Sequence, residues 1–290
     1  MSLAKTTPRR PPLTVRTVLT HAFLIAFTGV TLYPVLWVVA MALTPQQGFT
    51  IGLLPWPDEP SLDNFAHVVS TTSPDGSWLF GQQLLNSLIV SVSTTIVGIF
   101  LACTAGYAFS RFRFPGRRTG LLMFLVSQMF PGTLMLIPLY VLLDAMGLLN
   151  QIAGLVLVYS TTAIPFCVWM LKGYFDTIPQ SIEESAIIDG ASPFTIFWKI
   201  ILPLAQPAIA VTALFSFMTA WNEFILAATF INKESSLTLP VTLNNYVGEY
   251  STQWGYFAAG AIIVSVPVMA LFFALQKNLV GGLTAGSVKG

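Results

Sequence analysis

Charged side chains are scarce in this sequence of 290 residues. Asp, Glu, Lys and Arg make up 9% of it, whereas a typical soluble domain has about 25%. Hydrophobic residues make up 54%. Thirteen basic and 12 acidic side chains could not cover the surface of a soluble domain of this length. The shortage of charge excludes a soluble enzyme, a disordered chain and a protein that binds nucleic acid.

Cysteine and histidine are also scarce. Cys103 and Cys167 lie inside apolar runs, and His21 and His67 are far apart in the sequence. Residues so isolated predict neither a disulfide framework nor a metal site, and both cysteines are expected to be small buried hydrophobic residues. The chain has no Gly-Lys pair, so it lacks the glycine-rich loop that holds nucleotide phosphates.

Six apolar stretches are long enough to cross a membrane. A spanning helix needs about 20 residues, whereas a membrane strand needs about ten with alternating polarity. Because a backbone in lipid must satisfy its own hydrogen bonds, the sequence predicts an all-α membrane protein with six transmembrane helices in a single domain, 1–290. The predicted spans are residues 18–43, 84–109, 120–143, 152–171, 205–230 and 256–275.

The basic residues are distributed unevenly between the spans. If six spans alternate in direction, 12 of the 13 Lys and Arg residues lie on one side, with Lys233 on the other. Since basic loops stay in the cytoplasm, both termini and the loop 176–204 are predicted to be cytoplasmic, and the loops 44–83 and 231–255 extracytoplasmic. The first apolar run is longer than the 7–15 residues or so of a signal peptide, which favours an uncleaved anchor.

The inner loop carries two patterns that begin helices. Ser181 with Glu184 matches a capping box, and Ser192 precedes Pro193 as an N-cap precedes a proline at the first helical position. Gly190 lies between them, where a helix end often needs a left-handed residue. The patterns predict two short helices joined by a glycine elbow, whose tip could enter a groove of a partner. The alternative is an amphipathic helix that lies on lipid headgroups.

This loop resembles a motif of permease subunits of ATP-binding-cassette importers. The family pattern is Glu-Ala-Ala, three residues, Gly, nine residues, Ile, one residue and Leu-Pro, and the chain departs from it only at Ser185. The resemblance implies that the loop couples the permease to an ATPase subunit. The coupling residues that it implies are Glu183, Glu184, Ala186, Asp189, Gly190, Ala191, Ile200, Leu202 and Pro203.

Four more segments are similar to the carbohydrate branch of this family, in particular to the second, smaller permease subunit of maltose-type importers. They are residues 107–116, 128–131, 221–224 and 282–290. The resemblance implies a type I importer permease in the inner membrane of a prokaryote, which passes a di- or oligosaccharide. It implies four partners besides membrane lipid: a second permease subunit, two nucleotide-binding subunits that hold ATP and Mg, and an extracytoplasmic sugar-binding protein. The chain itself would be no enzyme and would bind no cofactor and no metal.

Glu223 is the one acidic residue within a predicted span. A charge there costs a few kcal/mol, so the side chain is expected to face the bundle interior or water. With Trp221 and Asn222 it forms a candidate sugar contact, because aromatic rings, amides and carboxylates bind sugars. The alternative is a polar cluster that packs helices or meets the partner permease. Weaker candidates for the substrate path, on the proline-containing third span, are Met129, Phe130 and Tyr140.

Other features leave alternatives open. Four arginines between the second and third spans, at 111, 113, 117 and 118, are assigned to topology and lipid anchoring, with contact to a nucleotide-binding partner as the alternative. The tail 281–290 either frays or reaches the nucleotide-binding subunits. An ion-coupled transporter would need ionisable residues at mid-membrane, where Glu223 is the one candidate. An intramembrane enzyme would need a nucleophile and base or metal ligands, which the spans lack.

Overall fold

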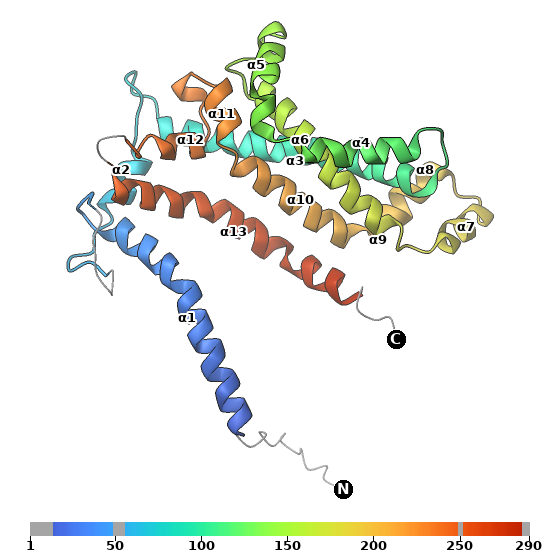
Figure 1. Cartoon of the computed structure of the whole chain (residues 1–290), viewed down its shortest axis with the longest axis horizontal. Coiled ribbons are helices and arrows are strands. Elements are labelled where there is room, and N and C mark those ends of the chain that lie inside the picture. Colours follow the sequence, from blue (N-terminus) through green and yellow to red (C-terminus); the bar gives the residue numbers. More distant parts are fainter. Residues whose placement is uncertain (1–13, 49–55, 249–251, 286–290) are drawn as a thin grey trace.

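The computed structural model describes residues 14–48, 56–248 and 252–285 (Figure 1). In these ranges the regular secondary structure is helical, and two isolated bridges, Thr72 to Trp78 and Val247 to Thr252, only close short turns. The all-α prediction is therefore confirmed for this part of the chain.

Four helices are long and apolar enough to cross a membrane by themselves. They are α1 (Val15–Leu43), α3 (Leu79–Arg111), α6 (Ile152–Phe175) and α13 (Trp254–Ala285). The shortest, α6, has 24 residues. At about 1.5 Å per residue, 24 residues reach about 36 Å, beyond the roughly 30 Å of a hydrocarbon core. Each helix extends past its predicted apolar span because polar residues such as Gln83 of α3 continue the helix outside that span.

The third predicted span is wrong as a continuous helix. It consists of α4 (Arg117–Met129), the short η1 (Gly132–Met135) and α5 (Leu136–Ala145), and the two halves are bent by 96°. The bend lies at Pro131. Its ring has no N–H to continue α4, and it forces the preceding residue Phe130 out of the helical region, to ψ 127°.

The fifth predicted span, 205–230, is also interrupted. It contains α10 (Gln206–Trp221) and α11 (Ile225–Phe230), separated by the three residues 222–224. A further bend of 75° at Ala205 separates α10 from the helices before it. Glu223 therefore lies in a break between two helices and not inside one.

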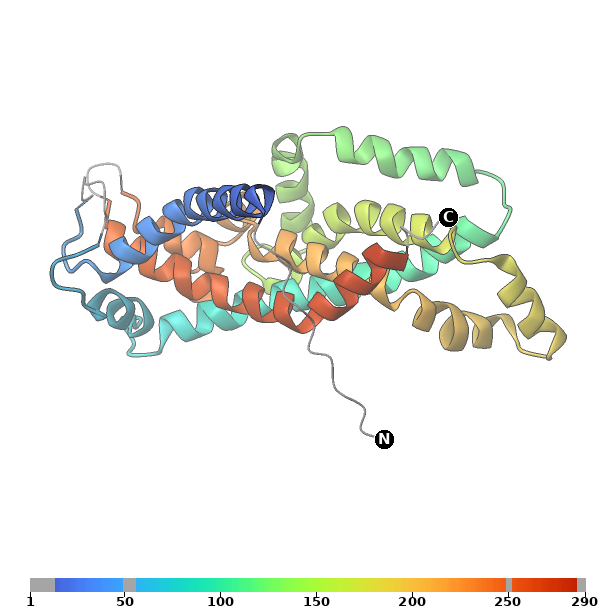
Figure 2. The ribbon, with the colours of Figure 1, turned by 90° about the horizontal axis from the view of Figure 1, so that it is seen from below.

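The centre of the fold is the pair α3 and α6, against which α10 packs, with α13 and then α1 on the outer side of α10 (Figure 1). The buried core includes Phe175, Tyr159 and Trp221, one in each of three clusters along the bundle. α1 contacts α13 near its C-terminal end and then diverges from it (Figures 1 and 2), and its apolar side chains from Val15 to Leu36 are exposed.

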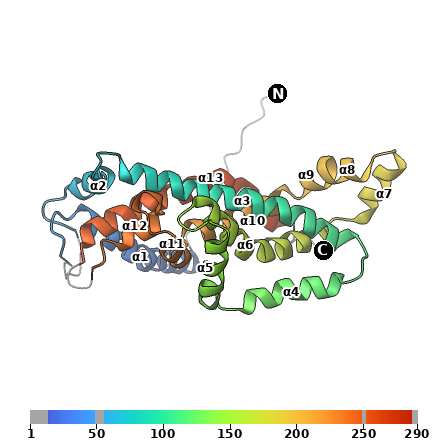
Figure 3. The ribbon, with the colours of Figure 1, turned by 90° about the horizontal axis from the view of Figure 1, so that it is seen from above.

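Short helices occupy the two ends of the bundle. One end carries α7 (Gln180–Ile188), α8 (Pro193–Ile196), the π-helical turn η2 (Phe197–Ile201) and α9 (Leu202–Leu204). The opposite end carries α2 (Asp63–Val69), η3 (Glu234–Ser236) and α12 (Leu239–Asn244) (Figure 3). Asn64 of α2 ties this end to α1, because its Nδ2 donates to the carbonyls of Ala42 at 3.0 Å and Thr44 at 2.7 Å. The loop 176–204 and the other two long loops thus lie at opposite ends of the molecule.

Candidate functional site

The start of α7 differs from the predicted capping box. The N-cap of α7 is Pro179, and no side chain caps the helix. Its φ of −59° and ψ of 131° lead into a helix that begins at Gln180. Ser181 and Glu184 therefore lie inside the helix, where the Ser181 carbonyl accepts a 2.8 Å hydrogen bond from Ser185 Oγ. The capping-box prediction is wrong, and Glu184 is left as an exposed side chain.

The glycine elbow is confirmed. Gly190 has φ 83°, in the left-handed region that a side chain disfavours. This conformation turns the chain back so that the N–H of Ala191 donates to the carbonyl of Ala186 at 2.9 Å. A Cβ at Gly190 would meet no atom within 4 Å, so the elbow points into open space. A side chain added here would stand on the outer surface of the turn.

The start of the second helix is also confirmed. Ser192 is the N-cap of α8, and its hydroxyl accepts from the N–H of Thr195 at 3.2 Å, with Pro193 following at the first turn. The helix then widens into the π-helical turn η2. Pro203 follows this turn and has no N–H to offer the carbonyl of Lys199, which fits a departure from α-helical bonding there. The turn directs Phe197 into the core beneath the spans.

The two helices divide the predicted coupling residues between a packed side and an open side. Ala186 is buried, and Ala191, Ile200 and Leu202 are partly buried against the same cluster. The open side combines exposed polar residues with large apolar ones. Its members are Glu184, Ile187, Ile188, Asp189, Gly190 and Phe194. Ile188 is 86% exposed and Phe194 is 73% exposed, which is unusual for apolar side chains at the end of a folded bundle.

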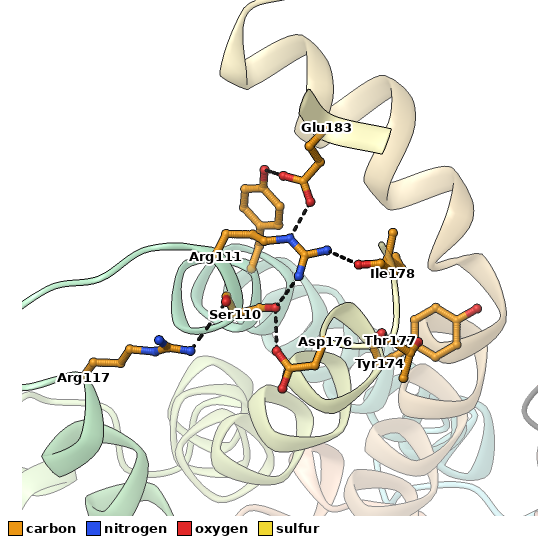
Figure 4. Close-up of polar contacts among 9 residues, drawn as sticks. Ser110, Arg111, Arg117, Tyr174, Asp176, Thr177, Ile178 and Glu183 are labelled. Atoms are coloured by element: carbon orange, nitrogen blue, oxygen red, sulfur yellow. Dashed lines mark hydrogen bonds and ion pairs between the residues drawn. The ribbon is translucent and has the colours of Figure 1, made fainter. Parts of the chain in front are cut away.

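A buried ion pair fixes α7 to the end of α3 (Figure 4). Arg111 Nε donates to Glu183 Oε1, and the Tyr107 hydroxyl donates to Glu183 Oε2 at 2.7 Å. Arg111 Nη2 also donates to the carbonyl of Ile178 at 2.9 Å, in the link between α6 and α7. The side chains of Arg111 and Glu183 are only 7% and 12% exposed. Sequence positions that are 72 residues apart are therefore joined at the base of α7.

A second carboxylate extends this contact to the end of α6. Arg111 Nη1 donates to Ser110 Oγ at 3.0 Å, and Ser110 Oγ donates to Asp176 Oδ1 at 2.7 Å. Lys172 Nζ lies 2.6 Å from Asp176 Oδ2. Burial raises the pKa of Asp176, but the hydrogen bonds from Lys172 and Ser110 outweigh it and hold this pKa below its ordinary value. We call Tyr107, Ser110, Arg111, Asp176 and Glu183 the α7 anchor.

Most of the α7 anchor was not predicted from the sequence. Arg111 and Arg117 were expected to serve topology and lipid anchoring, whereas Arg111 pairs with Glu183 and Arg117 Nε donates to the Phe109 carbonyl at 2.8 Å. The available signal was the spacing of Tyr107 and Arg111, which share one face of a helix. Arg113 and Arg118 are exposed. In the tail, residues 281–285 belong to α13, and 286–290 lie outside the described residues.

Glu223 caps a helix at the break that it occupies. Its Oε1 accepts from the N–H of Leu226 at 2.8 Å, and its Oε2 accepts from the N–H of Ala227 at 3.1 Å. The Tyr159 hydroxyl of α6 donates to Oε2 at 2.6 Å. Three donors of this chain thus engage both carboxylate oxygens, which agrees with the packing alternative for this residue.

Trp221 is packed inside the chain, which contradicts its predicted contact with the sugar. It is 1% exposed, its ring stacks on Phe217 at 5.4 Å, and its indole N–H donates to the carbonyl of Val264 at 3.1 Å. No face of the ring is left for a sugar in this conformation. The Trp221 ring is buried because the side of α10 that carries it packs against α13. The remaining path candidates are exposed: Asn222, Met129, Phe130 and Tyr140.

Comparison with known proteins gives a family and several relatives. Residues 94–284 match the family described as binding-protein-dependent transport system inner membrane component. The chain is 39% identical to the galactooligosaccharides transport system permease protein GanQ of Bacillus subtilis (strain 168), over 92% of the chain and 94% of GanQ. It is 37% identical to the maltodextrin transport system permease protein MalD of Streptococcus pneumoniae (strain ATCC BAA-255 / R6), over 94% and 95%. It is 34% identical to the trehalose transport system permease protein SugB of Mycobacterium tuberculosis (strain CDC 1551 / Oshkosh), over 90% and 94%.

A solved structure shares the fold. A chain of a bacterial ATP-binding-cassette transporter involved in the import of the acidic polysaccharide alginate superposes with a TM-score of 0.75, covering 92% of this chain and 99% of that chain. Sequence identity is 22%, so this likeness concerns the fold alone. The MetNI methionine transporter superposes with a TM-score of 0.60 at 17% identity, over 72% of this chain and 99% of that chain.

Proposed function

This chain belongs to the family of binding-protein-dependent transport system inner membrane components, and from that membership we propose that it imports a di- or oligosaccharide. Members of the family are permease subunits of ATP-binding-cassette importers in the inner membrane, and they are not themselves enzymes. One observation carries the choice of sugar. Relatives named for galactooligosaccharides, maltodextrin and trehalose each match at least 90% of the chain at 34–39% identity. All three names denote sugars of more than one ring.

The proposed topology has six spans, with both termini and the α7–α9 end in the cytoplasm. Four long helices and two bent pairs give up to six crossings if each bent pair is one span. The second bent pair combines residues 193–204 with 206–221, so the crossing there begins at the α7–α9 end. Among the described residues, six basic side chains lie toward the α7–α9 side (Figure 3), where the positive-inside rule puts the cytoplasm: Arg111, Arg113, Arg117, Arg118, Lys172 and Lys199. In this arrangement the chain is a single permease domain.

The proposed assembly joins this chain to a second permease subunit, two ATPase subunits and an extracytoplasmic sugar-binding protein. The family name specifies a binding protein. A solved structure of the alginate transporter is described as a complex with a pentasaccharide-bound periplasmic protein. We propose that ATP and Mg bind to the ATPase subunits and that this chain binds no cofactor, since its sequence offers no Gly-Lys phosphate loop.

The proposed coupling surface is the open side of the α7–α9 segment. Its exposed apolar side chains, Ile188 and Phe194, flank the elbow at Gly190 and are suited to an apolar groove of an ATPase subunit. The motif residues on the packed side, including Ala186 and Ile200, would hold this surface against the spans. Glu183 would act through the α7 anchor, whereas Glu184, Asp189 and Ala191 would lie at or beside the contact.

The substrate path is proposed to run beside the two broken spans. Asn222, Met129 and Tyr140 keep their place as candidates because they are exposed near the breaks. For Glu223 we propose the capping role in place of direct sugar contact, because three donors of the chain already engage its oxygens.

The function is tested by reconstituting the complete complex in proteoliposomes. ATP-dependent uptake would be measured with maltotriose, trehalose and a galactooligosaccharide, each loaded on the binding protein that is co-purified or encoded beside this chain. Uptake of at least one of these sugars, together with ATPase activity that the loaded binding protein stimulates, is the expected result. A complex that hydrolyses ATP but takes up none of them, while it imports an amino acid or an ion, would refute the sugar assignment.

A further inference from the structure

A cavity of about 480 Å³ lies beside the bend of the third span. Its walls come from α4, η1, α5, α6 and α11, so residues from three separate parts of the sequence, 127–139, 161–162 and 226, meet there. The polar and aromatic members of the lining are Ser127, Gln128, Phe130, Thr161 and Thr162. We call this space the bend cavity.

The lengths of α4 and α6 put the bend cavity close to the middle of the membrane when both helices cross it. Thr161 and Thr162 occupy the centre of α6, which runs from 152 to 175. Gln128 is near the far end of α4, whose 13 residues begin at Arg117. At 1.5 Å per residue, α4 reaches about 20 Å from its basic start, past the midplane of a core of about 30 Å. Both walls therefore present polar groups at a depth where lipid offers them no partner.

The backbone around the bend cavity offers carbonyl acceptors that lack a partner in the α-helical pattern. α4 ends at Met129, and the last four carbonyls of a helix have no partner within it. In α6, Pro165 has no N–H to offer the carbonyl of Thr161. The carbonyl of Thr162 accepts a hydrogen bond from the side-chain amide of Gln128 at 3.1 Å.

The bend itself cannot face lipid. Residues 130 and 131 are exposed on this chain and lie between α4 and η1, outside both helices. In the hydrocarbon region, irregular backbone is tolerated only where protein covers it or where it lines a water-filled space. Because the side chains of Gln128 and Phe130 open onto the bend cavity, the second condition matches the geometry here.

We propose that the bend cavity is the wall that this subunit contributes to the sugar path, and that it binds the hydroxyl groups of the passing di- or oligosaccharide. The inference rests on the proposed function and deepens it. Sugar hydroxyls would donate to the carbonyl of Thr161 and to the side-chain oxygens of Gln128 and Thr161. Phe130, which is 56% exposed, offers a ring face to the apolar side of a sugar ring.

The lining is suited to passage and not to tight retention. Met135, Leu139 and Leu226 supply the apolar part of the walls, and no charged side chain lines the cavity. Conduction requires contacts that are favourable enough for entry and weak enough for release. The nearby Trp221 and Glu223 are engaged within the chain, so the bend cavity replaces them as the sugar contact.

Thiol labelling of the complete complex in proteoliposomes tests the location. Gln128→Cys and Thr161→Cys would be treated with a membrane-impermeant methanethiosulfonate reagent, with the native chain as the background for its buried cysteines. Thr104→Cys is the matched control, since Thr104 is an exposed threonine of α3 whose hydroxyl also bonds to its own helix. We expect modification at 128 and 161 to be at least tenfold faster than at 104, and to slow when maltotriose-loaded binding protein and ATP are present. Equal rates at all three positions, or no effect of the sugar, would overturn the inference.

Uptake measurements test the contact. Phe130→Ala and Gln128→Ala are expected to change the ratio of maltotriose to trehalose uptake by about fivefold, the effect of losing one hydrogen bond or ring contact. Thr104→Val should leave the ratio unchanged. The native complex could import sugar while both cavity variants keep its uptake rates and its ratio of maltotriose to trehalose. The bend cavity would then be a packing site against the partner permease, and the inference would fail while the proposed function stands. If the native complex imports no sugar, the proposed function and the inference fall together.

Discussion

Replacing Glu183 by alanine is expected to loosen α7 from the spans without unfolding them. The carboxylate accepts from Tyr107 and Arg111, and the two members of the ion pair are 12% and 7% exposed. Removing one partner of a buried ion pair typically costs about 3–5 kcal/mol because the other charge is left unpaired. Here Arg111 keeps two acceptors, the Ile178 carbonyl and the Ser110 hydroxyl, at 2.9 and 3.0 Å. We therefore expect a smaller loss, of about 2–3 kcal/mol.

Hydrogen exchange of the α7 backbone amides measures this loss. If these amides exchange when α7 detaches, 2–3 kcal/mol lowers their protection by about 30- to 140-fold. The control is Glu184→Ala, which removes the same side chain at the next position, where it is exposed. Surface substitutions usually change stability by less than about 0.5 kcal/mol, so the control should change protection by no more than about twofold.

Glu183→Ala and Glu184→Ala also distinguish a residue that positions α7 from a residue that contacts the ATPase subunits. Glu183→Ala should insert in the membrane normally and bind the ATPase subunits less tightly, while the exchange of the α3 core stays unchanged. Glu183→Gln keeps an acceptor for Tyr107 and should fall between the native chain and alanine. Equal protection of α7 in Glu183→Ala and Glu184→Ala would refute the idea that the α7 anchor holds this helix.

The remaining predictions concern the elbow, the topology, the second break and acid. Gly190→Asp should cost about 1 kcal/mol in backbone strain yet abolish sugar-stimulated ATPase activity, because its side chain stands on the coupling surface; full stimulation would exclude this elbow from the contact. Cysteines placed at Arg113 and Asp63 should be labelled only from the cytoplasmic and only from the outer side, respectively, and outer labelling at 113 would reject six spans. Glu223→Ala should lower the melting temperature of the complex, since three donors lose their acceptor, while the ratio of sugars taken up stays unchanged; an altered ratio would restore sugar contact. Since the pKa of Asp176 is lowered in the folded chain, its stabilisation is present above about pH 3.9 and is lost as the pH falls through the folded value. Pepsin should therefore cut the native 176–190 segment faster as the pH drops below 3.9, but Asp176→Asn should show no such change.

The sequence determined the helical class and the approximate spans because both are local properties. An apolar run of about 20 residues in lipid has no partner for its backbone except itself, so the helix follows from the run. The elbow is equally local. Gly190 between two helix signals, with Ser192 before Pro193, specifies the turn through the conformations that those residues prefer. The bend at Pro131 was in principle available from the same rules, although the predicted span 120–143 ran through it.

The residues that hold the site together depended on tertiary structure. Arg111 and Glu183 are 72 positions apart, and Tyr159 and Glu223 are 64 apart, so no local pattern pairs them. In a chain this apolar, hydrophobicity does not tell the side of a helix that faces protein from the side that faces lipid or a path. Trp221 was accordingly a plausible sugar contact by its chemistry, but the packing of α10 on α13 buried it. The hydrogen-bond partners of Arg111 and Glu223 were likewise decided by packing. A buried polar group pairs with whichever partner the neighbouring helices bring within reach.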